Sequence, residues 1–385
     1  MLTGPSLSRF RSRLLSWFAQ SRRDLPWRRT KDSYRIWVSE IMLQQTRVTA
    51  VVPYYERFLG YFPDVRALAD APEEEVLRQW AGLGYYSRAR NLQKAAQKIV
   101  KEHDSRFPND LEKALGLPGI GPYTAPAILS IAHGRKLAVL DGNVARVLAR
   151  LGSVRGDLRG ANQWQKLQDA ADTLLAPRAP GDWNQAMMEL GATLCTPRSP
   201  QCLLCPIAEF CRARKLGLSE IIPAKRNKRA KVEITLAALV LTDPQGRTLL
   251  LPPPDADAKQ KSSVDPDVPR LLSRMWHFPT VLVRDNAEAE LRTFVARNIF
   301  GKRAIRGEFQ PLQRVRHAVT YRQITVQSFR LDIAKLPAIP GTKMLPLDNL
   351  SSVPISNLTR KVARVALPDR PEPPLERAQN EMLSF

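Results

Sequence analysis

The sequence contains no apolar run long enough to span a bilayer, and it has only four cysteines, all within one short stretch. The first 20 residues place arginines among apolar residues, without the apolar core or cleavage site of a signal peptide. They predict a short amphipathic helix. The clustered cysteines argue against a chain-wide disulfide framework. We therefore expect a protein of a reducing, cytoplasmic compartment rather than a membrane or secreted protein.

Acidic residues are scarce relative to basic ones. There are 37 Asp and Glu against 59 Lys and Arg, which gives a formal net charge of +22. An excess of this size suits a polyanionic partner, nucleic acid above all, and less often an acidic membrane surface. The length of 385 residues allows two or three domains, and the 44% hydrophobic content is typical of a globular protein.

The first part of the chain, residues 1–222, has the apolar periodicity of helices separated by short turns. A basic stretch nearly free of apolar residues, 223–231, then predicts a linker. The predicted helices of the first part cover 39–59, 73–81, 88–102, 122–133, 143–151, 162–175 and 183–194.

The second part, residues 232–365, changes to the alternation and turn signals of strands and predicts an α+β domain. A loop rich in Pro and Asp covers 252–270, and the tail 366–385 has the composition of a disordered segment. Strands are predicted at 232–243, 247–251, 275–283, 311–319 and 322–332, with a helix at 287–300.

The four cysteines, Cys195, Cys202, Cys205 and Cys211, have the spacing C-x6-C-x2-C-x5-C. Four thiolates this close can hold one metal centre, either zinc or an iron–sulfur cluster. Spacing alone slightly favours zinc, although structural zinc sites more often use paired CxxC motifs and only one is present here. No histidine lies near enough in sequence to complete a mixed site.

Two carboxylates stand out. Glu40 lies in a helical pattern whose neighbours Ile36, Trp37 and Leu43 are apolar, so burial would raise its pKa and make it a proton donor. Asp141 precedes a predicted helix in an Asp-Gly-Asn turn. A protonated and an ionised carboxylate together can cleave a glycosidic bond. The alternatives are a Glu that reaches solvent and an Asp that only caps a helix.

Several segments together resemble the MutY family of adenine DNA glycosylases. They are "DLPWR", "SEIMLQQT", "WAGLGYYSRARNL", "LPGIGPYTAPAILS", "LDGNVARVLAR" and "WNQAMMELGATLC", followed by the cysteine spacing. The resemblance covers residues 7–215 almost continuously. It implies an all-α helix-hairpin-helix glycosylase core with a [4Fe-4S] cluster held by the four cysteines in a loop at 195–211. It also implies removal of adenine mispaired with 8-oxoguanine or guanine in double-stranded DNA.

The resemblance also implies roles for single residues. Glu40 matches the acid that protonates the adenine, and Asp141 matches the carboxylate that stabilises the sugar cation. Tyr123 and Asn143 match residues that position Asp141 and shield the cation. The remaining matches are Trp27, Arg28 and Glu189 in the adenine pocket, and Gln45 and Tyr85 in the base stack near the opposite base.

The glycines of the stretch "LPGIG" predict a tight turn, and the resemblance implies that this turn is the hairpin of the helix-hairpin-helix at about 110–133. Gly119, Ile120 and Gly121 would there bring backbone N–H groups to a DNA phosphate. Related enzymes that also nick the strand carry a lysine nucleophile where this chain has Tyr123, so strand cleavage is not expected. Pro122 stands where the family more often has a basic residue, which removes one phosphate contact.

Residues 232–365 resemble, more loosely, the MutT-like (Nudix-like) domain that reads 8-oxoguanine in this family. No Glu-rich nucleotide-hydrolase box follows "RMWHFPTVLV", in which His277 replaces a common acid. Val319, Thr320 and Tyr321 stand where the family usually has a Phe-Ser-His loop. The substitutions predict a weakened preference for the lesion.

The sequence therefore predicts a monomeric, nucleoid-associated, monofunctional adenine DNA glycosylase. Two alternatives stay open. One is an oxidised-pyrimidine glycosylase with lyase activity, which Tyr123 and the second domain disfavour. The other is a catalytically silent DNA-binding protein that uses the cluster as a redox sensor, which has no need of Glu40, Asp141 and Tyr123 together.

Overall fold

The computed structural model describes residues 3–224, 230–253, 272, 275–301, 305 and 307–367. The chain divides into two compact units, Met1–Lys228 and Arg229–Phe385, which are described separately. Most of the predicted loop at 252–270, part of the predicted linker and nearly all of the predicted tail lie outside the described residues. Among the described residues, no helix combines the length and apolar character of a membrane span.

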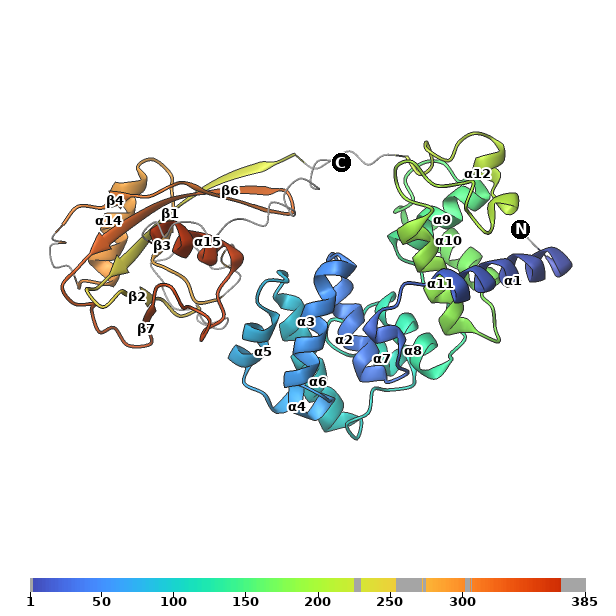
Figure 1. The fold of residues 1–385 in the computed structure, drawn as a ribbon, viewed down its shortest axis with the longest axis horizontal. Coiled ribbons are helices and arrows are strands. Elements are labelled where there is room, and N and C mark those ends of the chain that lie inside the picture. The colour runs from blue at the N-terminus through green and yellow to red at the C-terminus, as the bar shows by residue number, and fades with distance from the viewer. Residues whose placement is uncertain are drawn as a thin grey trace. The chain divides into compact units, whose positions relative to one another are not determined.

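The first unit is entirely helical, as the sequence predicted (Figure 1). Helices α2 to α8 bury large aromatic side chains, among them Trp37, Phe58 and Trp80, and α1 packs with α9, α10 and α11 around Phe10 and Trp183. The elements are α1 (Gly4–Ser21), η1 (Pro26–Arg28), α2 (Ser33–Leu43), α3 (Val48–Tyr61), α4 (Val65–Asp70), α5 (Glu73–Trp80), α6 (Ser87–Glu102), α7 (Leu111–Leu115), α8 (Thr124–His133), α9 (Gly142–Gly152), α10 (Ala161–Leu174), α11 (Pro180–Thr193), η2 (Ala208–Phe210) and α12 (Arg212–Lys215).

The single helix predicted over 39–59 is wrong, because α2 ends at Leu43 and α3 begins at Val48. Gln45, between them, has a φ of 59°, in the left-handed region that non-glycine residues seldom adopt. Residues 44–47, which connect the two helices, contain neither glycine nor proline, so the sequence carried no signal for the break. Conversely, Pro53 lies inside α3 without ending it.

The predicted hairpin connects α7 and α8. Helix α8 begins at Thr124, two residues after the predicted start at 122, and Pro122 precedes the capping residue Tyr123. Gly119 has a φ of +78°, and a Cβ there would lie 2.8 Å from the Cβ of Asn91 in α6. Glycine at this position is therefore required by the fold itself. At Gly121 an added Cβ would meet nothing within 4 Å.

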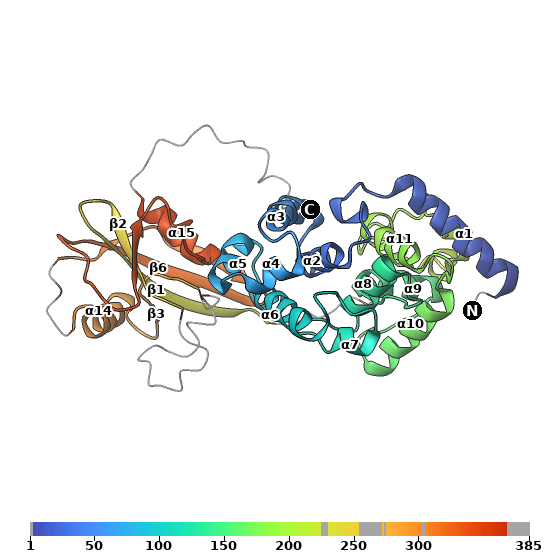
Figure 2. The same ribbon diagram turned by 90° about the horizontal axis from the view of Figure 1, so that it is seen from below.

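The second unit is the predicted α+β domain, built on a seven-stranded sheet in which long strands β1 and β6 pair in parallel. Helices α14 and α15 cover opposite faces of the sheet (Figure 2). The elements are β1 (Val232–Thr242), β2 (Arg247–Leu250), β3 (Thr280–Leu282), α14 (Ala287–Asn298), β4 (Gln310–Pro311), β5 (Val315–Val319), β6 (Arg322–Asp332), β7 (Lys343–Pro346) and α15 (Asn357–Ala366).

The edges of the sheet differ from the prediction. The strand expected over 275–283 is confined to β3, with isolated bridges at Trp276 and His277, and the strand expected over 311–319 is divided into β4 and β5. Strand β7 and helix α15 were not predicted. Alternation along β1 sends successive side chains to opposite faces, one packed against α15 and one against α14.

Candidate active site

A cavity of about 210 Å³ in the first unit brings together residues that lie far apart in sequence. Its wall comes from η1, from α2, from the starts of α8 and α9, and from α11. Seven of the residues predicted for catalysis and base binding line it: Trp27, Arg28, Glu40, Tyr123, Asp141, Asn143 and Glu189.

Glu40 lies in the middle of α2 with a side chain that the fold removes from water. The residue is 5% exposed. Burial raises the pKa of Glu40 to about 7, and the charge of Asp141 acts in the same direction, while a hydrogen bond from Tyr123 lowers it in part. The Tyr123 hydroxyl donates to Oε2 of Glu40 at 2.9 Å. Near neutral pH Glu40 can therefore hold a proton and release it.

Asp141 is the N-cap of α9. Its Oδ1 accepts the backbone N–H of Val144 at 2.7 Å, and its Oδ2 accepts the side-chain amide of Asn143 at 3.1 Å. Burial raises the pKa of Asp141, while these two bonds act in the opposite direction. The capping role that the sequence left as an alternative is real, and the same carboxylate also faces the cavity.

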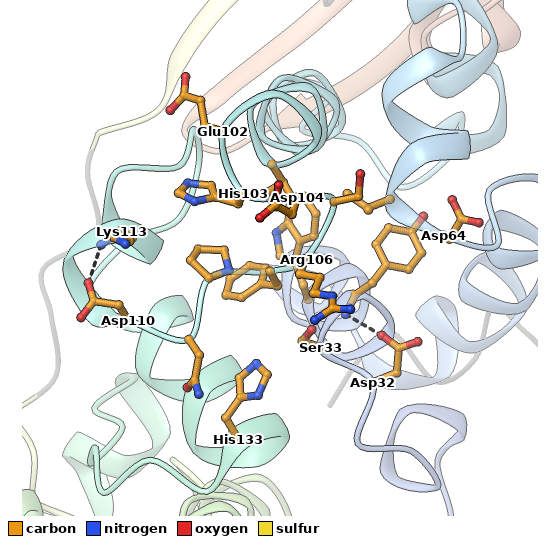
Figure 3. Close-up of a pocket in the computed structure, with 18 residues that line it drawn as sticks. Asp32, Ser33, Asp64, Glu102, His103, Asp104, Arg106, Asp110, Lys113 and His133 are labelled. Atoms are coloured by element: carbon orange, nitrogen blue, oxygen red, sulfur yellow. Dashed lines mark hydrogen bonds between the residues drawn. The ribbon is translucent and has the colours of Figure 1, made fainter.

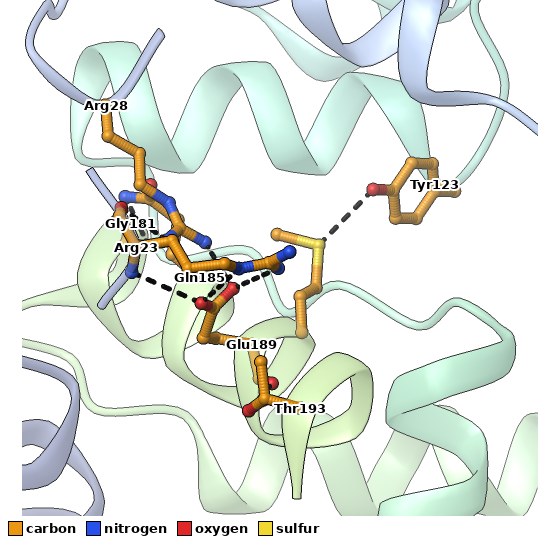
Figure 4. A network of polar contacts seen from close by, with 8 residues as sticks. Arg23, Arg28, Tyr123, Gly181, Gln185, Glu189 and Thr193 are labelled. Atoms are coloured by element: carbon orange, nitrogen blue, oxygen red, sulfur yellow. Dashed lines mark hydrogen bonds and ion pairs between the residues drawn. The ribbon is translucent and has the colours of Figure 1, made fainter. Parts of the chain in front are cut away.

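Glu189 is held by two arginines (Figure 4). Its carboxylate accepts Nε and Nη2 of Arg23, each at 2.7 Å, and Nη2 of Arg28 at 2.8 Å. Burial alone would raise the pKa of Glu189, but the arginine bonds outweigh it and lower the pKa to about 2. Sequence reasoning missed Arg23, because no local pattern separates it from the other arginines near the N-terminus.

The residues predicted to contact DNA lie outside this cavity. Gln45 and Tyr85 share an uncommon backbone, with φ of 59° and 45°, and both are exposed. Gly119 and Gly121 occupy the turn between α7 and α8, where Ile120 is 6% exposed and packs inward. The backbone of this turn, rather than the side chain of Ile120, is available to a partner.

The four cysteines gather in the loop that follows α11. Burial raises the pKa of Cys205 to about 12, a hydrogen bond from the backbone of Ile207 lowers it in part, and the charges of the other three cysteines act in the same direction as burial. No group of three His, Cys, Asp or Glu among the described residues is arranged to hold a single metal ion. Four cysteine thiolates are the ligand set of a cubane cluster, so the four cysteines of this loop fit an iron–sulfur cluster.

Two buried arginines of α9 connect the cysteine loop to the core. Arg150 is 2% exposed and donates to the carbonyl of Thr196 at 2.8 Å and to Sγ of Cys195 at 3.2 Å. Arg146 donates to the carbonyl of Cys195 at 2.8 Å and to Oδ1 of Asn143 at 2.9 Å. Sequence reasoning missed both, although each follows Asp141 on α9.

A larger cavity, about 770 Å³, lies elsewhere in the first unit and contains none of the predicted site residues (Figure 3). Three of its carboxylates begin helices. Asp32, Asp64 and Asp110 each accept backbone N–H groups as the N-caps of α2, α4 and α7. These carboxylates have a structural use, so the smaller cavity is the better candidate for chemistry.

In the second unit, Val319, Thr320 and Tyr321 form the tip of the hairpin between β5 and β6. Thr320 has a φ of 55° and is exposed, and its hydroxyl donates to the carbonyl of Val319 at 2.7 Å. His277 lies away from this tip, buried, with its Nδ1 2.7 Å from the carbonyl of Phe278.

Comparison with known proteins agrees with this geometry. Residues 38–171 match the HhH-GPD superfamily of base excision DNA repair proteins, and residues 195–211 match the iron–sulfur binding domain of endonuclease III. The chain is 34% identical to adenine DNA glycosylase of Homo sapiens, over 92% of this chain and 73% of that protein. It is 35% identical to adenine DNA glycosylase of Mus musculus, over 92% and 77% respectively.

Among solved structures, a thermostable thymine-DNA glycosylase matches with a TM-score of 0.51 and 29% identity, over 55% of this chain and 97% of that one. The chain therefore belongs to the adenine DNA glycosylase family and is a DNA N-glycosylase with a [4Fe-4S] cluster.

Proposed function

We propose that this protein removes adenine mispaired with 8-oxoguanine or guanine from double-stranded DNA and leaves the strand intact. The observation that carries the proposal is the pair formed by buried Glu40 and Tyr123 in a cavity that also contains Asp141. Glu40, with a pKa of about 7, supplies the acid, and Asp141 in the same cavity supplies the anion. The family to which the chain belongs is named for its action on adenine, which supplies adenine as the base.

The chemistry begins with an adenine flipped out of the stack into the cavity, because a stacked base is out of reach. Glu40 gives its proton to a ring nitrogen of the base while the glycosidic C–N bond breaks and its electron pair goes to the adenine. Asp141, held in place by Asn143 and the N-terminus of α9, stabilises the positive charge on the sugar. Water then adds to C1′, and a carboxylate takes its proton.

Hydrolysis without strand cleavage follows from the nucleophiles at hand. None of the described residues that line the cavity is a lysine, and the Tyr123 hydroxyl donates a hydrogen bond to Glu40. A Schiff base needs an amine. Water is therefore the acceptor of the sugar, and the product is an abasic site.

The base pocket is formed by Trp27, Arg28 and Glu189. Trp27 is 7% exposed and packs edge-on against Tyr55, so its ring is fixed before a base enters. Glu189 is already ion-paired to Arg23 and Arg28. The cation of Arg28 is thereby oriented at the wall of the cavity, where it can donate to the acceptor nitrogens of adenine.

Recognition of the duplex involves the remaining predicted residues. Gln45 and Tyr85 would enter the stack near the opposite base, and the turn at Gly119 to Gly121 would bind phosphate. Thr320 at the hairpin tip would meet the polar edge that distinguishes 8-oxoguanine from guanine. The net charge of +22 supports binding to DNA, and we expect the protein to act as a monomer in the cytoplasm, associated with the nucleoid.

One assay tests the proposal. The full chain is incubated with an 8-oxoguanine:adenine duplex, and the products are separated with and without hot alkali; a parallel sample receives borohydride. We expect strand breaks only after alkali and no covalent adduct. A duplex with cytosine in place of adenine is the control. Breaks without alkali, or no release of adenine, would contradict the proposal.

A further inference from the structure

Arg88, near the start of α6, is a buried cation bonded to carbonyl groups at the end of α2. Only 9% of the residue is exposed. Its Nη1 donates to the carbonyls of Ile41 and Met42, each at 2.9 Å, and also to that of Gln44. These are carbonyls that a helix end leaves without intrahelical partners. Arg88 therefore caps the C-terminus of α2.

The same guanidinium also holds the turn before α6. Its Nη2 donates to the carbonyl of Leu83 at 3.2 Å and to that of Gly84 at 3.4 Å. It also reaches the hydroxyl of Thr46 at 3.2 Å, and the cation lies 5.5 Å from the ring centroid of Tyr85. One side chain thus connects two segments about forty residues apart.

Each of the two segments carries one exposed residue with left-handed backbone, Gln45 in the first and Tyr85 in the second. Such conformations persist only where the surroundings fix them. Arg88 bonds the carbonyl just before Gln45 and the carbonyl just before Tyr85. Among the described residues it forms no ion pair, so the backbone carbonyls are its main charge partners.

We infer that Arg88 is the positioning residue that holds Gln45 and Tyr85 at a fixed separation and ties both to the helix that carries Glu40. The inference rests on the proposed function, in which these two residues read the base opposite the adenine. The carbonyls that Arg88 binds belong to the residues directly after Glu40. A shift of the backbone at Gln45 or at Tyr85 therefore displaces the C-terminus of α2, the helix that carries Glu40.

Lysine cannot replace this arrangement. Its ammonium group keeps the charge, but it has three donors at one point, whereas the planar guanidinium reaches acceptors on two segments at once. Arg88→Lys therefore removes the connection while keeping a buried cation.

The test measures the ratio of the dissociation constants for a matched duplex and an 8-oxoguanine:adenine duplex, at one stated salt concentration. The full chain with Glu40→Gln is used so that no adenine is released during binding. We expect Arg88→Lys to lower this ratio at least tenfold, mainly through weaker binding of the mispaired duplex. Unspecific binding to the matched duplex should change little, because Arg88 is buried.

Arg11 provides a matched control. It also caps a helix C-terminus, donating Nε to the carbonyl of Leu174 at 3.0 Å and Nη2 to that of Thr173 at 3.1 Å, but at the end of α10. Arg11→Lys should leave the ratio within twofold. If Arg88→Lys lowers the urea midpoint more than Arg11→Lys does, the milder variant Thr46→Val is used in its place. Thr46→Val removes a single acceptor of Arg88 and should lower the ratio about threefold.

A double-mutant cycle separates positioning from general stability. Arg88 bonds the backbone before Gln45 and not its side chain, so the two substitutions are independent unless Arg88 acts through the position of Gln45. Because Arg88 also holds Tyr85, we expect Arg88→Lys to lower the ratio clearly less than tenfold in a Gln45→Ala background, and by less than twofold when Tyr85→Ala is added. Additive effects, or an unchanged ratio in Arg88→Lys itself, would overturn the inference. A parent chain that does not prefer the mispaired duplex would overturn the proposed function as well.

Discussion

Arg146 donates a hydrogen bond to the carbonyl of Cys195, an iron–sulfur ligand, and the two atoms lie 2.8 Å apart. The other side of the same guanidinium reaches Asn143, whose amide bonds Asp141. Three hydrogen bonds thus connect the cysteine loop with Asp141, the carboxylate that we propose to stabilise the sugar cation. We therefore expect the cysteine loop to help position Asp141, because the carbonyl of Cys195 is one end of this hydrogen-bond chain.

Arg146→Lys should slow excision without emptying the cluster site. Lysine cannot bond Asn143 and the carbonyl of Cys195 together, so Asn143 loses its orientation toward Asp141. Displacement of a catalytic group by about 1 Å costs up to about 100-fold in rate, and we expect a 10- to 100-fold fall in the single-turnover rate. Iron content and affinity for the mispaired duplex are measured alongside. An unchanged rate at full iron content would show that Asn143 needs no such support.

Glu40→Gln should bind the mispaired duplex and release almost no adenine. Glutamine preserves the shape and can accept the hydrogen bond from Tyr123, but it has no acidic proton. General acid catalysis contributes about 10²- to 10⁴-fold, and at least this loss is expected in single-turnover rate. In the parent enzyme the rate should fall as the pH rises above about 7, the pKa of Glu40. If Glu40→Gln keeps more than a tenth of the parent single-turnover rate, a group other than Glu40 protonates the adenine.

The same carboxyl group should make the first unit less stable at alkaline pH. Folding raises the pKa of Glu40 from about 4.5 to about 7, so the native state binds the proton more tightly than the unfolded chain. The stabilisation of the native state by protonated Glu40 is complete below pH 4.5, declines between about pH 4.5 and 7, and is absent above about pH 7. Ionisation of Glu40 therefore lowers the free energy of unfolding by about 3 kcal/mol across this pH range.

Glu40→Gln removes this titration. Relative to the parent protein, the variant should gain stability as the pH rises from 5 to 8. Urea unfolding followed by circular dichroism at a series of pH values measures the difference. Parallel curves for the two proteins across this range would contradict the raised pKa.

The purified protein should contain iron and acid-labile sulfide at about four each per chain, since a cubane cluster has that composition. Elemental analysis of anaerobically prepared protein measures both. Replacing Cys202 with Ala should lower the iron content and expose the loop to proteolysis, because Arg150 then loses part of the ordered structure it binds. One zinc and no iron would restore the alternative that the cysteine spacing alone slightly favoured.

Thr320→Val should reduce the preference for 8-oxoguanine over guanine opposite adenine. Threonine places a hydroxyl at the exposed tip of the hairpin, and a good polar base contact provides about 1–3 kcal/mol of discrimination. Valine has nearly the same shape, so the hairpin is retained. The ratio of single-turnover rates on the two mispairs should fall about tenfold. A ratio that survives in Thr320→Val would move lesion recognition to Val319, Tyr321 or the first unit.

How far the sequence leads depends on whether a feature is local. The apolar neighbours of Glu40 predicted a buried acid, and the Asp-Gly-Asn turn predicted a cap, because both patterns lie within a few residues. That Glu40, Tyr123 and Asp141 share one cavity could not be derived from local patterns and came from the family resemblance. Arg23 was missed because its partner, Glu189, lies 166 residues away.

The errors in secondary structure have the same origin. The break between α2 and α3 is maintained by Arg88, which follows 42 to 47 residues later, so residues 39–59 alone looked like one helix. Helix α15 is an exception, because it was missed although its N-cap Ser356 and the helical spacing of Leu358, Val362 and Ala366 are local signals. The long strands β1 and β6 were predicted correctly, since β1 contains the continuous apolar run 236–241 and β6 largely alternates polar with apolar residues.

Two separate features of the structure require glycine at position 119. The backbone at a φ of +78° penalises any residue with a Cβ, and the Cβ of Asn91 occupies the space that such an atom would take. Trimming Asn91 to glycine would relieve the collision but not the backbone penalty. Relaxing the turn would relieve the penalty but would move the loop away from α6. A search for second-site suppressors of Gly119→Ala should therefore return true revertants and no single compensating change. Position 119 therefore cannot change its residue through a series of single tolerated substitutions.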